Sequence, residues 1–206
     1  MSDFFSMIDV ALFNVINTAA ANPVFDFIMP PLTDWNKSWI GLSLFGSGYL
    51  CFLWKGGRKA RIVGLLLVVL ILFTDQLSSH LLKPLISRPR PCHVVDSKPV
   101  IDHVRLLVEC GSGYSFPSSH AVNNFGFAVF LGYYYRRWQW LLLFYAFLMA
   151  LSRVVVGVHF PSDVAAGAVI GTACAYTLIW LWNLVGARYT FLQIQPQERH
   201  EMVKAA

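Results

Sequence analysis

Long apolar stretches alternate with short polar segments along most of the chain. A helix needs about 20 residues to cross the hydrocarbon core of a bilayer. Five stretches reach or approach that length, at 38–54, 62–82, 119–135, 138–157 and 162–185. The third takes part of its length from the polar SSHAVNN segment at its start. This pattern predicts an all-α, polytopic membrane helical bundle of about five transmembrane helices.

The first 35 residues follow a different pattern. Apolar residues recur there at roughly helical spacing, at Phe4, Phe5, Ile8, Leu12, Val15 and Ile16. We interpret 3–20 as an amphipathic helix in the membrane interface, followed by a second short helix after Asn22-Pro23. A sixth span is the alternative, although Asp9, Asn14 and Asn17 make it less favourable. A single domain over 1–206 is expected, with interfacial helices at 1–35, a transmembrane core at 36–185 and a tail at 186–206.

Composition also indicates a membrane protein. Of the 206 residues, 56% are apolar and 13% are charged, about half the charged fraction of a soluble domain. The formal net charge is +5 at pH 7, but Lys and Arg are divided among short loops and form no continuous basic stripe. A nucleic-acid partner is therefore not expected.

The basic loops predict the orientation, because short loops rich in Lys and Arg face the cytoplasm. Three basic segments fall on one side of a five-span arrangement. They are KGGRKAR after the first span, Arg136-Arg137 after the third, and the tail with Arg188, Arg199 and Lys204. We expect a multi-pass protein of the cytoplasmic (inner) membrane, with its C-terminus in the cytoplasm and residues 1–35 outside.

Basic residues on the predicted outer side need another explanation, and an anionic ligand supplies one. Lys83 ends the second span, and Arg88 and Arg90 follow in the proline-stiffened segment KPLISRPRP. Guanidinium groups match phosphate oxygens bidentately, while Lys acts as a point charge. A basic flank that anchors a helix end explains this cluster equally well when it is taken alone. Asp75, within the second span, is expected to support the Lys83 region or brace a neighbouring helix.

A second polar cluster, GYSFPSSHAVNN, leads into the third span. Ser115 and Ser118 offer helix caps there, and Pro117 offers a helix start. Ser118, Ser119 and His120 would then lie at a helix N-terminus, where unpaired backbone N–H groups bind anions. An ordinary capped helix with an interfacial histidine is the alternative.

The third cluster, SRVVVGVHFPSD, joins the last two spans. Arg153 precedes a break at Gly157, and Asp163 follows His159 by four residues. A carboxylate at this spacing can accept the Nδ1 proton, which leaves Nε2 with a lone pair and makes the histidine a nucleophile. A structural His–Asp pair is the alternative, but His, Arg and Asp together at a membrane boundary favour a functional site.

All three clusters are expected on the same outer face, a coincidence that three unrelated explanations would not predict. Their spacing resembles the type 2 phosphatidic acid phosphatase superfamily, which is related to the vanadium haloperoxidases. Its pattern is met by Lys83 with Arg90-Pro91, by Pro117-Ser118-Ser119-His120, and by Ser152-Arg153 with His159 and Asp163. One departure is Ser119, which replaces the usual glycine and either narrows the pocket or adds a hydroxyl.

The resemblance implies a role for each matched residue. His159 would attack phosphorus, His120 would act as the general acid, and Asp163 would orient His159. The phosphate would be bound by Lys83, Arg90, Arg153, the hydroxyl of Ser118 and the backbone of Ser119, with Arg88 added because it lies in the same stretch. The residues themselves agree on the two histidines, since only His159 has a carboxylate at short range.

We therefore expect a membrane phosphatase that uses a phosphohistidine intermediate and neither a metal nor another cofactor. The substrate is expected to be a membrane lipid phosphate or pyrophosphate bound at the outer face. Undecaprenyl pyrophosphate is the first choice because the site faces outward; phosphatidylglycerol phosphate, phosphatidic acid and lipid A phosphate stay open. Two further alternatives are a lipid phosphate binder or transporter without turnover, and a lipid phosphotransferase.

The loop before the third span carries four further residues of interest. Cys92 and Cys110 bracket it and could form a disulfide if the loop faces an oxidising compartment. His93 and His103 resemble metal ligands only weakly, and we interpret them as solvated loop residues.

Overall fold

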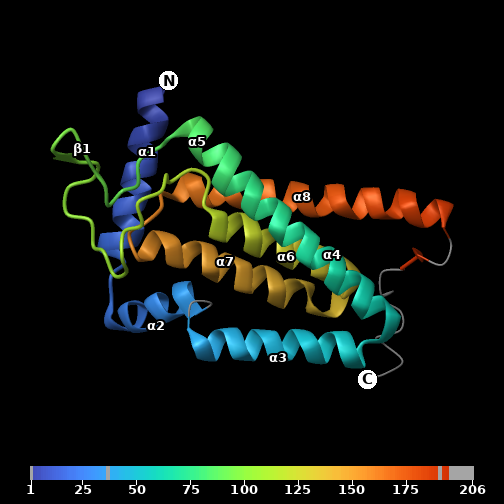
Figure 1. The fold of residues 1–206 in the computed structure, drawn as a ribbon. Coiled ribbons are helices and arrows are strands. Elements are labelled where there is room, and N and C mark those ends of the chain that lie inside the picture. Colours follow the sequence, from blue (N-terminus) through green and yellow to red (C-terminus); the bar gives the residue numbers. More distant parts are fainter. Residues whose placement is uncertain (1, 36–37, 190–191, 195–206) are drawn as a thin grey trace.

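The computed structural model describes residues 2–35, 38–189 and 192–194, and most of that length is helical (Figure 1). The α-helices are α1 (Ser2–Asn14), α2 (Pro23–Asp34), α3 (Trp39–Lys55), α4 (Gly57–Gln76), α5 (Lys83–Ile86), α6 (Ser119–Tyr134), α7 (Gln139–Val155) and α8 (Pro161–Arg188). Shorter turns adjoin them: the π-helical η1 (Val15–Ala19) and η3 (Leu77–Leu82), and the 3-10 turn η4 (Arg136–Trp138). An antiparallel hairpin of β1 (Val94–Val95) and β2 (Lys98–Pro99) lies in the loop before α6. The predicted polytopic helical bundle is confirmed.

Each of the five predicted spans is a helix in the structure. The helices α3, α4, α6, α7 and α8 run along a common axis, whereas α1 crosses that axis at one end (Figure 1). We call this end the α1 end. It also holds α5, the β hairpin, the last turn of α7 and the first turns of α6 and α8. The opposite end, the η4 end, holds the α3–α4 turn and the last turn of α8.

Three helical segments are long and apolar enough to cross a membrane by themselves: Gly57–Ile86, Arg136–Val155 and Pro161–Arg188. The helices α3 and α6 have 17 and 16 residues, which is shorter than the about 20 residues of a full crossing. The N-terminal helices qualify only as a pair, Phe4–Ala19 with Pro23–Asp34, and the chain bends by 112° between them. The number of five spans and the interfacial placement of 1–35 therefore stay predictions.

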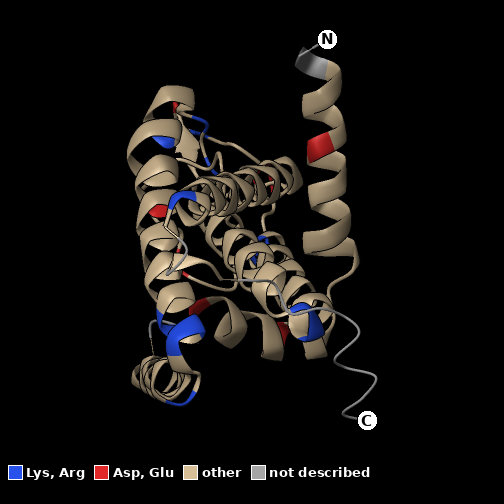
Figure 2. Cartoon of the chain, turned by 90° about the vertical axis from the view of Figure 1, so that its right-hand side faces the viewer, with Lys and Arg blue, Asp and Glu red and all other residues tan. Residues whose placement is uncertain are grey.

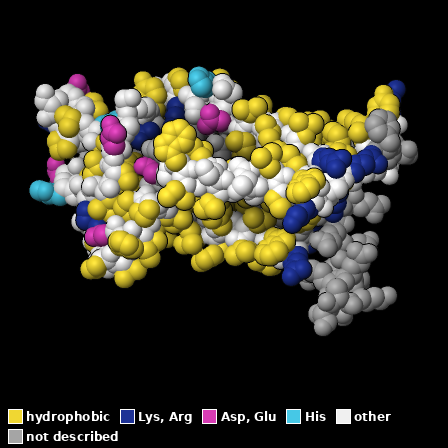
Figure 3. Space-filling model, turned by 60° about the horizontal axis from the view of Figure 1, so that its bottom comes forward, with side chains coloured by type: hydrophobic (Ala, Val, Ile, Leu, Met, Phe, Trp, Pro, Cys, Tyr) yellow, Lys and Arg dark blue, Asp and Glu magenta, His cyan; other side chains and the backbone are white. Residues whose placement is uncertain are grey.

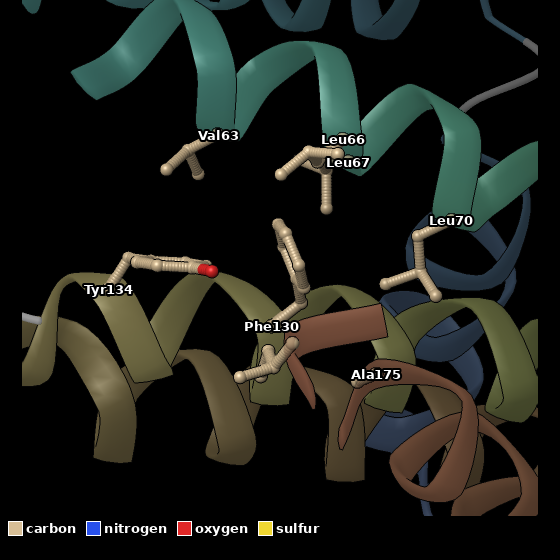
Figure 4. Close-up of a cluster of buried hydrophobic side chains, with 8 residues drawn as sticks. Val63, Leu66, Leu67, Leu70, Phe130, Tyr134 and Ala175 are labelled. Atoms are coloured by element: carbon tan, nitrogen blue, oxygen red, sulfur yellow. The ribbon is translucent and has the colours of Figure 1, made fainter. Parts of the chain in front are cut away.

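A hydrophobic cluster joins α4, α6 and α8 (Figure 4). The α4 side chains recur at helical spacing, so that they form one face of that helix. This face packs against the α6 side chains Phe130 and Tyr134 and against Ala175 of α8. The α4 members are Val63, Leu66, Leu67 and Leu70. The close packing fixes α4 against the two helices whose first turns carry predicted site residues.

Small residues allow α6 and α8 to approach closely. A Cβ on Gly171 would lie 2.1 Å from the carbonyl oxygen of Val122, so no larger residue fits there without a shift of the helices. At the α1 end, the backbone N–H of Ser118 donates to the carbonyl oxygen of Asp163 at 3.1 Å. The first turns of α6 and α8 therefore lie side by side.

Charged residues collect toward the two ends of the bundle. Figure 2 views the molecule from the η4 end, where the basic residues are Lys55, Arg58, Lys59, Arg61, Arg136, Arg137 and Arg188. Figure 3 shows a broad hydrophobic band between the two ends on the face that it draws. Acidic residues and histidines gather at the α1 end of that face. The predicted tail residues Arg199 and Lys204 lie outside the described residues.

Candidate active site

The three sequence motifs meet at the α1 end. Lys83 begins α5, Arg153 lies in the last turn of α7, and Asp163 lies in the first turn of α8. Lys83 is within electrostatic range of Arg90, Arg153 and Asp163. The structure thus brings together residues that a long loop and a helical hairpin separate in sequence.

His159 lies in the turn between α7 and α8 and is 2% exposed. Its backbone N–H donates to the carbonyl oxygen of Arg153 at 3.3 Å. Gly157 shapes the turn, because its φ of 87° is left-handed and a Cβ there would meet the carbonyl oxygen of Arg105 at 2.8 Å. The turn therefore carries the imidazole into the protein interior, next to α8.

The imidazole of His159 has a carboxylate and a hydroxyl beside Nδ1. Asp163 Oδ2 is 3.6 Å away and Ser115 Oγ is 3.4 Å away. Burial lowers the pKa of His159 to about 4, because Asp163 offsets the loss of water only in part and Arg153 and Arg90 add positive charge. A neutral imidazole at physiological pH, with its Nδ1 edge toward Asp163, leaves Nε2 as the nucleophilic nitrogen.

Asp163 is fully buried and is held by three donors. Its Oδ2 accepts from the backbone N–H of Phe160 at 2.8 Å and from the hydroxyl of Ser115. Its Oδ1 accepts from Arg88 Nη1 at 2.7 Å. These contacts fix the carboxylate that faces His159 and satisfy a charge that would be costly to bury alone.

Arg88, which we predicted to bind the phosphate, pairs with two protein carboxylates in the structure, and its contact with phosphate stays a prediction. Its Nη1 pairs with Asp163, and its Nη2 lies 2.6 Å from Asp9 Oδ2. The guanidinium also stacks over the Phe160 ring at 4.0 Å. This geometry favours a positioning role for Arg88. The pairing could not be predicted from local spacing because Asp9 precedes Arg88 by 79 residues.

Arg90 is buried in the loop before α6. Its Nε donates to the carbonyl oxygen of Gly113 at 2.7 Å. A Cys92–Cys110 disulfide closes this loop, which resolves the possibility that the sequence left open. His93 Nε2 lies 2.9 Å from the carbonyl oxygen of Gly111, so His93 braces the loop. In the described ranges, no group of three or more His, Cys, Asp or Glu side chains is arranged to hold a metal ion.

Two buried polar atoms point to an anionic ligand. Arg153 Nη1 donates to Thr33 Oγ1 at 2.8 Å and lies 3.7 Å from Asp34. Among the described residues, Arg153 Nε and Ser118 Oγ have no hydrogen-bond partner, although both are buried. Buried donors are rarely left without an acceptor. The oxygens of a phosphate would satisfy both.

The start of α6 differs from the expectation in detail. Ser118 occupies the N-cap, but its side chain makes no capping hydrogen bond, and Ser115 binds Asp163 instead of capping. The helix begins at Ser119, two residues after Pro117. Ser118 is therefore at the predicted N-cap position but does not cap through its side chain, and Ser115 does not cap the helix because its hydroxyl binds Asp163.

Ser119 and His120 follow in the first turn. The hydroxyl of Ser119 hydrogen-bonds with Ser78 at 3.0 Å and lies 3.2 Å from Ser79 Oγ, so the departure from glycine ties α6 to η3. The carbonyl oxygen of His120 accepts from Asn124 Nδ2 at 2.8 Å. His120 lines a cavity of about 720 Å³ between α3, α4, α6 and α7.

The N-terminal helices reach the site through polar side chains that sequence reasoning had not assigned to it. Asp9 accepts from the backbone N–H of Ser162 at 2.9 Å, in addition to pairing with Arg88. Asn17 donates to the carbonyl oxygen of Val155 at 2.8 Å, and Thr33 contacts Arg153. Polar residues on otherwise apolar helices were the available signal, but Asp9 and Asn17 served only as an argument against a sixth span, and Thr33 had no assigned role.

The helical bundle and the cluster of Lys, Arg, Ser and His side chains at its α1 end agree with the class of membrane phosphatases that the motifs predict. The chain belongs to the PAP2 superfamily, whose profile matches residues 64–187. A lipid A 4'-phosphatase of Bacteroides thetaiotaomicron is 33% identical over 193 residues, which cover 91% of this chain and 83% of that protein. An undecaprenyl-diphosphatase of Sulfolobus acidocaldarius is 30% identical over 149 residues, or 66% of each chain.

Two solved structures share the fold. LpxE of Aquifex aeolicus superposes with a TM-score of 0.63 at 27% identity, covering 82% of this chain and 93% of that chain. A PAP2-type phosphatidylglycerolphosphate phosphatase of Bacillus subtilis superposes with a TM-score of 0.65 at 22% identity, covering 86% and 85%. The second likeness concerns the fold alone. The resemblance inferred from the sequence motifs is confirmed.

Proposed function

We propose that this protein removes phosphate from a membrane lipid by way of a phosphohistidine intermediate. The observation that carries the proposal is a buried His159 beside a fixed Asp163, within electrostatic range of Arg90 and Arg153. A neutral imidazole is a nucleophile, and the surrounding cations attract a phosphate to it. The family relationship supports the same reaction class.

The reaction proceeds in two displacements. His159 Nε2 attacks phosphorus, the bond from phosphorus to the lipid oxygen breaks, and His120 gives that oxygen a proton. Water then attacks the phosphohistidine, His120 takes up a proton from it, and inorganic phosphate leaves His159 free. Asp163 holds Nδ1 through both steps and stabilises the positive charge that develops on the ring.

Positively charged side chains stabilise the phosphate during this reaction. Lys83, Arg90 and Arg153 surround the phosphate, and Ser118 Oγ and the Ser119 backbone donate to its oxygens. Charge that develops on phosphoryl oxygens is stabilised by donors already in place. We propose that these groups suffice without a metal or another cofactor.

We place the site on the outer face of the cytoplasmic membrane and the C-terminus in the cytoplasm. The basic loops at the η4 end support this orientation through the excess of Lys and Arg in cytoplasmic loops. The Cys92–Cys110 disulfide at the α1 end supports it as well, since disulfides persist in oxidising compartments. The substrate is then a lipid of the outer leaflet.

Two lipid classes lead among the substrates. Undecaprenyl pyrophosphate is favoured by an outward-facing site and by a relative, an undecaprenyl-diphosphatase, whose alignment covers 66% of this chain. Lipid A phosphate is favoured by a second relative, a lipid A 4'-phosphatase, whose alignment covers 91% of this chain. Phosphatidylglycerol phosphate and phosphatidic acid complete the panel to be tested.

Phosphate release by the purified protein from this panel of lipids, in the presence of EDTA, tests the proposal. We expect release in the wild type and none in His159→Ala. Binding of these lipids without phosphate release would indicate a lipid phosphate binder or transporter rather than an enzyme. Transfer of the phosphate to a second lipid, with little free phosphate, would indicate a phosphotransferase.

A further inference from the structure

We propose that the cavity beside His120 receives the leaving group of the substrate and selects a sugar-linked lipid phosphate over a lipid diphosphate. The inference rests on the proposed function, in which His120 protonates the leaving oxygen. The group that leaves must therefore lie next to His120. Asp75 is the residue to which we assign the selection.

The cavity has a polar end and an apolar end. The polar end lies at the first turns of α6, with Asp75 opposite on α4; its other members are Ser119, His120, Asn123 and Asn124. From Asp75 the lining continues along α4 to Leu67, eight residues or about 12 Å away. On α6 it continues to Phe127, seven residues or about 10 Å from His120. A substrate would meet polar groups next to its phosphate and apolar groups beyond them.

Contacts with α6 hold the Asp75 carboxylate at the cavity wall. Asn123 Nδ2 donates to Asp75 Oδ1 at 3.4 Å, and Thr74 donates to Asn123 Oδ1 at 2.8 Å. The predicted bracing of a neighbouring helix by Asp75 is therefore observed. Carboxylate oxygens accept hydrogen bonds, and Asp75 also lies within electrostatic range of Lys83. Its complement in a ligand is a hydroxyl or an amide N–H.

The two leading substrates present opposite groups to this carboxylate. The leaving group of a lipid diphosphate is itself a phosphate, which carries negative charge toward Asp75 and is repelled by it. The leaving group of a sugar phosphate is an alcohol, and the hydroxyl and amide groups of the sugar next to it can donate to Asp75. The acyl chains of such a lipid continue into the apolar end. A polyprenyl chain offers no hydrogen-bond donor at the polar end.

Three probes in matched mixed micelles test the inference on the purified full-length protein. They are a glucosamine-based lipid A phosphate, undecaprenyl phosphate and undecaprenyl diphosphate. We expect kcat/KM to be highest for the sugar-linked phosphate and lowest for the diphosphate. The two values should differ by on the order of tenfold or more, because one like-charge contact has about this effect.

Asp75→Asn removes the charge and keeps an oxygen that can accept from Asn123. We expect this variant to raise the diphosphate-to-sugar-phosphate ratio of kcat/KM about tenfold, because the repulsion is lost. Asp102→Asn removes a carboxylate from the exposed loop and should leave the ratio unchanged. Asn124→Leu supplies a second variant of the polar end, in which kcat/KM for the sugar-linked phosphate should fall more than that for undecaprenyl phosphate.

Failure of the inference and failure of the proposed function give different results. The proposed selection is overturned if the wild-type protein hydrolyses the diphosphate at least as well as the sugar-linked phosphate. This comparison uses the wild-type protein alone. An unchanged ratio in Asp75→Asn also overturns the selection. Absence of phosphate release from these three lipids and also from phosphatidylglycerol phosphate and phosphatidic acid would instead overturn the proposed function.

Discussion

The ionisation of His159 sets a lower pH limit for the proposed reaction. Attack on phosphorus requires the neutral imidazole, and burial lowers the pKa of His159 to about 4. The nucleophile therefore stays available above about pH 4 and is lost as the pH falls through that value. The acid limb of kcat/KM should reflect this pKa rather than the ordinary value of 6.5.

The phosphate of the substrate also titrates, so the profile should be recorded with two lipids whose phosphate groups ionise at different pH. A limb that moves with the lipid belongs to the substrate, and one that is common to both belongs to the protein. A common limb near pH 6.5 would mean that burial does not lower the pKa of His159 in the working enzyme.

Asp163→Asn tests the orienting carboxylate. The amide keeps the size of the side chain but cannot stabilise the charge that develops on His159, so kcat should fall by about 100-fold or more. In the proposed mechanism Lys83, Arg90 and Arg153 provide most of the phosphate binding, so KM should change little. Steady-state kinetics separate the two quantities, and turnover equal to that of the wild type would remove Asp163 from the mechanism.

The motif residues could be predicted from the sequence because their spacing is local. Asp163 follows His159 by one helical turn, so their proximity needed no knowledge of the fold. The partners of Arg88 and Arg153 could not be predicted in this way. Asp9 lies 79 residues from Arg88, and Thr33 lies 120 residues from Arg153. Such pairs depend on how the helices pack.

At the scale of elements, the N-terminal helices hold the site from outside the segment that the family profile matches. Asp9→Asn removes one of the two carboxylates on Arg88, which frees Arg88 to shift toward Asp163 and disturbs the geometry at His159. Small displacements of catalytic groups are costly, and we expect kcat to fall about tenfold. Kinetic assays of Asp9→Asn and of the size-changing Asp9→Glu check this.

The matched control is Asp96→Asn, which removes an exposed carboxylate from the β hairpin loop. It should retain wild-type kcat. Thermal unfolding of all three variants shows whether a loss of activity reflects a loss of fold. If Asp9→Asn has the same kcat as the control, α1 anchors the protein in the membrane and does not hold the geometry of the site.

The helices themselves were largely foreseen, because apolar stretches and polar breaks mark their limits. The bounds of α7 and α8, Gln139–Val155 and Pro161–Arg188, differ from the predicted spans by a few residues at most. The break between α1 and α2 was foreseen from Asn22-Pro23, but its angle of 112° was not. The π-helical η3 was not foreseen either, and it makes a tertiary contact through the hydrogen bond from Ser78 to Ser119 of α6.

At the scale of the whole molecule, the account requires the two ends of the bundle to face opposite compartments. A fluorescent protein fused to the C-terminus should fluoresce, because the tail lies in the cytoplasm where such reporters fold. Alkaline phosphatase fused at the same position should be inactive. Active alkaline phosphatase together with a non-fluorescent reporter would show that the orientation is the opposite one, with the site on the inner face of the membrane.

The most direct test of the central claim is to identify the phosphorylated residue during turnover. The protein is mixed with a lipid substrate carrying labelled phosphate, quenched in alkali, which preserves phosphohistidine, and digested for mass spectrometry. The account predicts label on His159 in the wild type and none in His159→Ala. Turnover without any labelled histidine, or label on His120 alone, would contradict it.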